Sequence, residues 1–101
     1  MRILVMFDLP VETVAQRQEY RKFRKYLLKQ GFIMLQESNY CKMVPNSAAG
    51  DTLINGLRVN KPAAGTVQVL KVTEKQFSKM EYLVGQANDT VINDDRRLVI
   101  L

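Results

Sequence analysis

Few side chains in this sequence could do chemistry, because two common catalytic residue types are absent or nearly so. The 101 residues include no histidine and a single cysteine, Cys41. Catalysis by serine–histidine or cysteine–histidine pairs is therefore excluded, as are histidine metal ligands, disulfides within the chain and zinc sites made of several cysteines. Any catalysis must rest on carboxylates, hydroxyls and a hard metal ion. We expect Cys41 to be a buried structural thiol.

Asp8 is the carboxylate best placed to act. It follows the apolar run 3–7 and precedes Pro10 by two residues, so it stands where a strand gives way to a loop. One carboxylate is a poor Mg²⁺ site, because that ion requires octahedral oxygen ligands, but a two-fold axis would pair Asp8 with its copy. A structural alternative stays open, in which Asp8 accepts hydrogen bonds from the following turn. The acidic pair 94–95 is interpreted as solvated.

Cations gather on one predicted helix. Between Thr13 and Gln30 there are six cations and one acid, Glu19. Like charges four residues apart each destabilise a helix by a few tenths of a kcal/mol, and a solvated face usually mixes its signs. The row therefore predicts a face that binds polyanions such as duplex phosphates, with a merely solubilising face as the alternative. We assign nucleic-acid binding to Arg17, Arg21, Arg24, Lys25 and Lys29, and the sixth cation is Lys22.

Length and composition predict one domain over residues 1–101. The chain has a net charge of +5, from 15 Lys and Arg against 10 Asp and Glu, and 47% of its residues are hydrophobic. The longest apolar runs, 3–7 and 98–101, fall far short of the roughly 20 residues of a membrane span, and the start of the chain does not resemble a signal peptide. We therefore expect a cytoplasmic protein with no membrane partner.

The elements that position these residues follow from the apolar periodicity. Helices are predicted at 12–30 and 47–59, and a Thr73-x-x-Gln76 capping box opens a third, short helix that runs to Gly85. Strands are predicted at 2–7, 32–35, 39–44, 66–72 and 98–101. The order predicts an α+β, ferredoxin-like βαββαβ fold with a central first strand, an extra short helix and a fifth strand. The core would span about 1–85, and the C-terminal loop and strand about 86–101.

The apolar C-terminus implies a partner. Four apolar residues end the chain and need a sheet edge, in the same chain or in another. We therefore expect a homodimer closed by Leu98, Val99, Ile100 and Leu101. An RNA-recognition module of the same fold is disfavoured, because the third strand offers only Tyr40 as an aromatic and carries no RNP-like motif.

Several motifs in a fixed order give the chain a family resemblance. From about residue 3 to residue 101 it resembles the small "Cas-two" subunit of CRISPR adaptation systems. The sequences of its motifs are most similar to those of the type II-A branch. The motifs that carry the resemblance are Val5–Pro10, Tyr20–Lys25, Gly31–Gln36 with Ser38 and Tyr40 behind it, and Val72–Phe77.

The resemblance implies a fold, partners and an activity. It implies a ferredoxin-like homodimer whose fifth strand crosses to the partner's sheet. It also implies that the dimer bridges two dimers of the Cas-one integrase and holds the pre-spacer, a double-stranded DNA, along a basic surface. Members of the family are described as Mg²⁺-dependent endonucleases on RNA or DNA, with a metal-binding aspartate after the first strand that corresponds to Asp8.

Two functions therefore compete. One is a non-catalytic scaffold that binds pre-spacer duplex and bridges integrase dimers during spacer acquisition. The other is a stand-alone, metal-dependent endonuclease that uses paired Asp8 residues. The sequence supplies six helix cations for the first and one well-placed carboxylate without a histidine base for the second. We therefore favour the scaffold, with which a trace nuclease activity is compatible.

Overall fold

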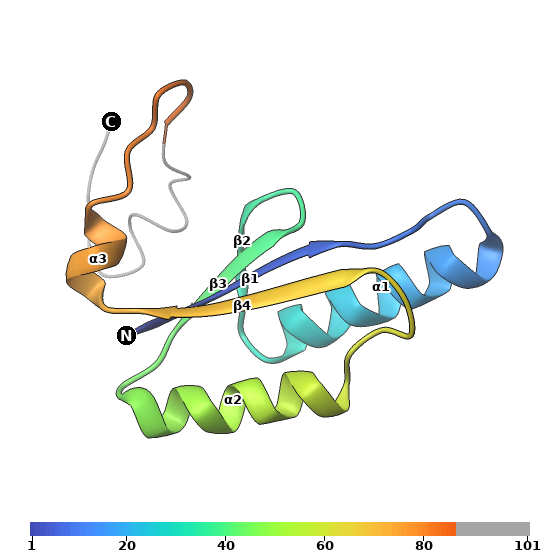
Figure 1. Ribbon diagram of the computed structural model, residues 1–101, viewed down its shortest axis with the longest axis horizontal. Coiled ribbons are helices and arrows are strands. Elements are labelled where there is room, and N and C mark those ends of the chain that lie inside the picture. Colours follow the sequence, from blue (N-terminus) through green and yellow to red (C-terminus); the bar gives the residue numbers. More distant parts are fainter. Residues whose placement is uncertain (87–101) are drawn as a thin grey trace.

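The computed structural model describes residues 1–86, which form a single antiparallel sheet, two long helices on one of its faces and a short helix at one end (Figure 1). The elements in chain order are β1 (Arg2–Asp8), α1 (Val14–Lys29), β2 (Ile33–Gln36), β3 (Asn39–Met43), α2 (Ser47–Val59), β4 (Thr66–Val72) and α3 (Glu74–Ser78). The predicted C-terminal strand 98–101 and the acidic pair 94–95 lie outside the described residues.

The strand order confirms the ferredoxin-like α+β prediction. The order is β2-β3-β1-β4, so β1 is central and is paired antiparallel with β3 on one side and β4 on the other. Leu4 stands opposite both Cys41 and Leu70, and Asp8 stands opposite Thr66. This is the split βαβ arrangement, in which the two helices return the chain across the same face of the sheet.

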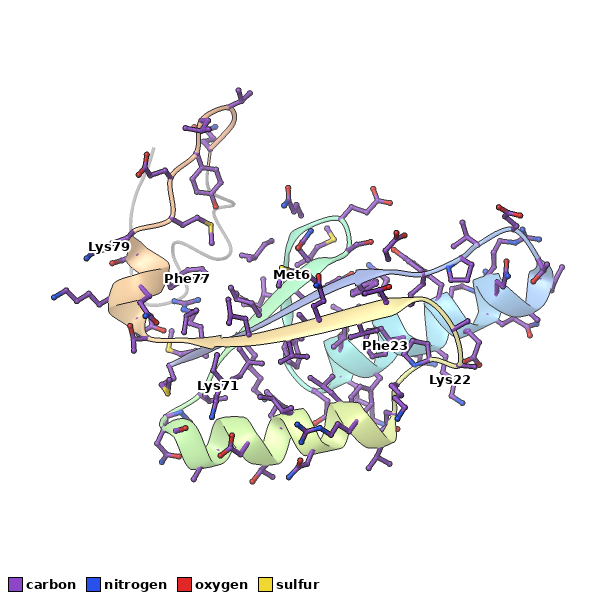
Figure 2. The ribbon with its side chains drawn as sticks, in the orientation of Figure 1. Met6, Lys22, Phe23, Lys71, Phe77 and Lys79 are labelled. Carbon is purple, nitrogen blue, oxygen red and sulfur yellow. The ribbon has the colours of Figure 1, made fainter. Side chains whose placement is uncertain are left out.

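The alternation of side chains along β1 separates two faces of the sheet. Ile3, Val5 and Phe7 point towards α1 and α2 and are at most 6% exposed. They pack with Phe23 of α1 and Leu57 of α2 in one core. Leu4, Met6 and Asp8 alternate with them and so point to the other face, here called the open face. Figure 2 shows the two sides, with Met6 above the sheet and Phe23 on the helix side.

Local capping signals set where the helices begin. Thr13 and Gln16 form a capping box, in which the Thr13 hydroxyl accepts from Gln16 N–H and the Gln16 side chain accepts from Thr13 N–H. Asn46 caps α2 by accepting from the N–H of Ala49. Each cap satisfies backbone donors that the first helical turn leaves unpaired. Both helices accordingly lie within about two residues of their predicted ranges.

The third helix begins as predicted but ends early. Thr73 and Gln76 form the predicted capping box, yet α3 stops at Ser78 instead of continuing to Gly85. Lys79 closes the helix by donating its N–H to the carbonyls of Gln76 and Phe77. Helices in proteins are stabilised mainly by the packing of an apolar face, and the following residues Leu83 and Val84, at 91% and 92% exposure, supply no such packing for a longer helix.

Within residues 1–86, no helix is long and apolar enough to cross a membrane.

Candidate functional site

The predicted cationic row lies on the solvent side of α1. Phe23 and Leu27 of this helix are buried against the sheet, at 2% and 0% exposure. The residues on the opposite side of the helix are exposed, and they include Arg17, Arg21, Lys22, Arg24, Lys25 and Lys29. The structure therefore places all five proposed nucleic-acid ligands, together with Lys22, on one accessible layer of the molecule.

Among residues 1–86, no acidic side chain forms an ion pair with this row. Within the described part of the chain, the ion pairs join Glu74 to Arg2 and to the N-terminal ammonium, and Asp51 to Lys71. None of them includes a residue of α1. The charge of the helix is therefore available to an external polyanion, which releases counterions when it binds.

Arg17 also has a structural contact that sequence reasoning missed. Its Nη1 donates to the backbone carbonyls of Val11 and Glu12, both at 3.1 Å. Arg17 therefore supports the loop between β1 and α1, and its guanidinium has further N–H groups for a phosphate. Arg21, Arg24, Lys25 and Lys29 are exposed surface cations further along the helix.

Asp8 ends β1 on the open face of the sheet, and its side chain is exposed. Its cross-strand neighbour is Thr66, the first residue of β4. Gly65, which precedes Thr66, has φ of +95° and packs so closely that an added Cβ would lie 2.7 Å from the Asp8 carbonyl oxygen. Glycine is thus needed at this position both for its backbone angle and for the close approach of the loop to β1.

Residues 1–86 of one chain do not provide a complete metal site around Asp8. Within residues 1–86, no group of three or more histidine, cysteine, aspartate or glutamate side chains could hold a metal ion. Mg²⁺ is often bound through one or two carboxylates together with waters and substrate phosphates. The exposed carboxylate of Asp8 fits that pattern when a second copy supplies its counterpart. Asp8 therefore fits the role of one Mg²⁺ ligand, and within residues 1–86 no cluster of carboxylates completes the site.

The structure does not bring Asp8 and the cationic row together. The cations lie on the outer surface of α1, which covers the helix face, whereas Asp8 points to the open face. A duplex lying along α1 and a phosphate held at Asp8 of the same chain would therefore be on different sides of the sheet.

A buried cluster around Arg2 escaped the sequence analysis. Arg2 is 6% exposed. Its Nε donates to both carboxylate oxygens of Glu74, at 2.9 and 3.1 Å. Its guanidinium lies 4.3 Å from the ring centre of Phe77. Burial works against the charged form, but the hydrogen bonds to Glu74 and Cys41 outweigh it, so the pKa of Arg2 lies above its ordinary value. The cluster fixes α3 over one end of the open face. The sequence signal that could have indicated this cluster is Arg2 itself, a charged residue at the start of an apolar strand.

The open face carries an apolar groove that the sequence analysis did not predict. It has a volume of about 480 Å³ and lies between the sheet residues Leu4, Met6 and Leu35 and the segment that follows α3. In that segment Leu83 and Val84 are 91% and 92% exposed. Apolar surface of this kind typically marks an interaction site.

Comparisons with known proteins agree on one family. The family model described as "CRISPR associated protein Cas2" matches residues 1–80. The "CRISPR-associated endoribonuclease Cas2" of Treponema denticola is 50% identical over 101 residues, which is the full length of both chains. The protein of the same description from Streptococcus mutans serotype c (strain UA159) is 48% identical over 101 residues, all of this chain and 93% of that one.

A solved structure supports the fold. The crystal structure of Streptococcus pyogenes Cas2 at pH 6.5 superposes with a TM-score of 0.59 and 19% sequence identity. The match covers 83% of this chain and all of that chain. At this identity the similarity concerns the fold alone.

Proposed function

The chain belongs to the CRISPR-associated Cas2 family, and on this premise we propose that it is a homodimeric scaffold of spacer acquisition. In this role it binds pre-spacer duplex DNA and bridges dimers of the Cas-one integrase.

The observation that carries the proposal is the uncompensated cationic face of α1. Its six cations are exposed and, among residues 1–86, none takes part in an ion pair. A row of cations at four-residue spacing follows a phosphate backbone without reading base sequence. Sequence-independent binding is what a scaffold for varied pre-spacers requires.

The open face supports the homodimer. The helices cover the other face, and the open face presents an apolar groove together with Leu70, which is 50% exposed. In a two-fold symmetric dimer, the open face of each chain would cover the open face of the other. The terminal residues Leu98–Leu101, which lie outside the described range, would add a strand at the edge of the partner's sheet.

The alternative function is metal-dependent hydrolysis of RNA or DNA. The relatives named above are described as endoribonucleases. In this alternative the two Asp8 carboxylates of the dimer would hold Mg²⁺, which activates a water and stabilises charge on a phosphate. The chain itself would position the carboxylates, and the tight packing of Gly65 against Asp8 keeps the end of β1 in place.

One experiment separates the two functions. The purified Cas-one integrase of the same system is given labelled pre-spacer duplex and a plasmid with a CRISPR repeat, with and without this protein. The same preparation is incubated with single-stranded RNA and with DNA in Mg²⁺. We expect efficient integration only when the protein is present. Integration at the same rate without it, together with robust cleavage, would replace the scaffold by the nuclease.

A further inference from the structure

The turn between β2 and β3 is fixed against the end of β1, next to Asp8. The backbone carbonyl of Ser38 in this turn accepts a hydrogen bond from the N–H of Phe7 at 3.0 Å. Ser38 has φ of +66°, in the left-handed region that residues other than glycine rarely adopt. Such strain persists only where the surrounding structure holds it, and it is frequent at functional sites. The contact keeps Asn39, the first residue of β3, close to the end of β1.

Asn39 lies on the same face of the sheet as Asp8. It stands opposite Met6 in the pairing of β3 with β1, and Figure 2 shows Met6 on the open face. Asn39 also lines the groove of that face. Because Asp8 follows Met6 by two residues, Asn39 and Asp8 are diagonal neighbours, a relation that spans about 7–8 Å between adjacent antiparallel strands. Side chains in this relation can contact one small ligand between them.

The Asn39 carboxamide is oriented by a hydrogen bond that leaves its oxygen available. Its Nδ2 donates to the backbone carbonyl of Glu37 at 3.2 Å. Within residues 1–86, its Oδ1 accepts no hydrogen bond. The proposed dimer covers the open face, and there an amide oxygen with neither a donor nor a cation beside it would be destabilising. Asn39 therefore requires a polar partner, and the strand register places Asp8 and its ligand within reach.

We propose that Asn39 is an oxygen donor of the Mg²⁺ site at Asp8. The inference rests on the metal-dependent activity given above as the alternative function. An amide oxygen is a hard and neutral donor, of the kind that accompanies carboxylates and waters around Mg²⁺. In a two-fold dimer, the paired Asp8 carboxylates would balance the charge of one such ion, and the paired Asn39 carboxamides would add oxygen donors without adding charge.

Mn²⁺ binding to the full-length protein tests this role without a measurement of cleavage. Mn²⁺ takes the same oxygen ligands as Mg²⁺, and the EPR signal of the free ion reports how much is bound. We expect Asn39→Leu to weaken Mn²⁺ binding about tenfold. Asn39→Asp puts a charged oxygen at the same position, so we expect it to bind Mn²⁺ more tightly than the wild type does. Gln36→Leu is the matched control with wild-type Mn²⁺ affinity, because Gln36 lines the same groove from β2, one strand further from Asp8.

The opposite changes expected for the two Asn39 variants separate ligation from a structural role. Both variants lose the hydrogen bond to Glu37, so equal weakening by both would mean that Asn39 only holds the turn, and the proposal would be overturned. Sedimentation velocity is run in parallel. Altered dimerisation of Asn39→Leu at wild-type Mn²⁺ affinity would make Asn39 a dimer contact and would overturn the proposal as well. Asn39→Leu decides alone if Asn39→Asp does not fold.

Asp8→Asn distinguishes failure of this inference from failure of the function on which it rests. Equal Mn²⁺ binding by the wild type and Asp8→Asn would remove the metal site, and the alternative function and the role of Asn39 with it. Lost Mn²⁺ binding in Asp8→Asn, together with wild-type affinity in both Asn39 variants, would overturn the role of Asn39 alone. The scaffold function stands in either case, and we expect Asn39→Leu to support integration as the wild type does.

Discussion

At the scale of single residues, the two ends of β1 use charge in different ways. Arg2 is buried, and Glu74, Phe77 and Cys41 satisfy its guanidinium, so this charge holds α3 to the sheet. Asp8 is exposed at the other end of the strand, where the loop before β4 packs against its backbone. A well-positioned and accessible carboxylate can take up a metal ion, whereas the Arg2 guanidinium is shielded from a further ligand by its burial.

Substitution of Asp8 by asparagine separates metal chemistry from scaffolding. Asn keeps the size of the side chain and its capacity to accept a hydrogen bond, but it loses the charge that attracts Mg²⁺. We expect Asp8→Asn to reduce hydrolysis of RNA or DNA to the level of a protein-free control. The variant should still dimerise, bind duplex and support integration by its partner.

The readouts for Asp8→Asn are a labelled-substrate cleavage assay, sedimentation velocity and the integration assay on one preparation. Asp51→Asn is a suitable control, because Asp51 lies on α2 and pairs with Lys71 far from the open face. Undiminished cleavage by Asp8→Asn would mean that the activity belongs to another site or to a contaminating nuclease. The acidic pair 94–95 would then be the next site to test. Lost integration with intact dimer and duplex binding would make the metal site part of spacer acquisition.

Residue roles were predictable where the signal is local. The position of Asp8 at the end of the central strand follows from the adjacent apolar run and Pro10, and the structure places it there. Arg2 and Glu74 are 72 residues apart in sequence, so no local pattern links them. The Arg17 contact with the β1–α1 loop was equally hidden, because it depends on how the loop folds back on the helix. The nucleic-acid and metal roles themselves stay predictions.

At the scale of elements, α1 has different chemistry on its two sides. Its buried apolar residues complete the core, and its cations are exposed on the opposite side. The start of the helix was predictable, because a capping box is a four-residue pattern with a direct physical cause. The end of α3 was not, since the sequence does not reveal that Leu83 and Val84 stay exposed and leave a longer helix without packing.

The salt dependence of duplex binding tests the cationic face. Each lost phosphate contact should reduce the slope of log affinity against log salt by about 0.9 for duplex DNA. We therefore expect Arg21→Ala with Lys25→Ala to reduce the slope by about 1.8. Arg17→Ala should contribute a further decrease, and because it also loosens the β1–α1 loop its thermal stability should be measured in parallel. Fluorescence anisotropy on duplexes of two unrelated sequences gives the slopes.

Two cations at the short helix, one within it and one at its C-cap, provide the control for that experiment. Lys75 and Lys79 are exposed and lie at the α3 end of the molecule, where Figure 2 marks Lys79. Their double alanine variant removes the same net charge but not the row on α1, so its slope should stay close to the wild-type value. An equal loss of slope in both variants would mean that net charge alone governs binding, and the α1 face would then be merely solubilising.

At the scale of the whole molecule, the sheet divides the protein into a basic helical layer and an apolar open face. The strand order and the central position of β1 were predictable, because the βαββαβ order of elements is that of the ferredoxin-like fold and an uninterrupted apolar run fits its central first strand. The groove on the open face was not, since its two sides are the sheet and the segment after α3, and no local sequence pattern places these next to each other. Two layers with different chemistry suit a protein that joins a second copy on one side and a polyanion on the other.

Removal of residues 97–101 tests whether the C-terminus closes the dimer. Leu98, Val99, Ile100 and Leu101 are apolar, and each contributes about 1.5–3 kcal/mol when fully buried, on both chains of a symmetric dimer. We expect the shortened chain to sediment as a monomer or to aggregate through its exposed open face. Arg97→Ala removes the one charge that the deletion also removes, and this variant should remain a dimer of wild-type stability. A soluble dimer that survives the deletion would show that the open face associates without the terminal strand, and the proposed exchange of strands between the two chains would be wrong.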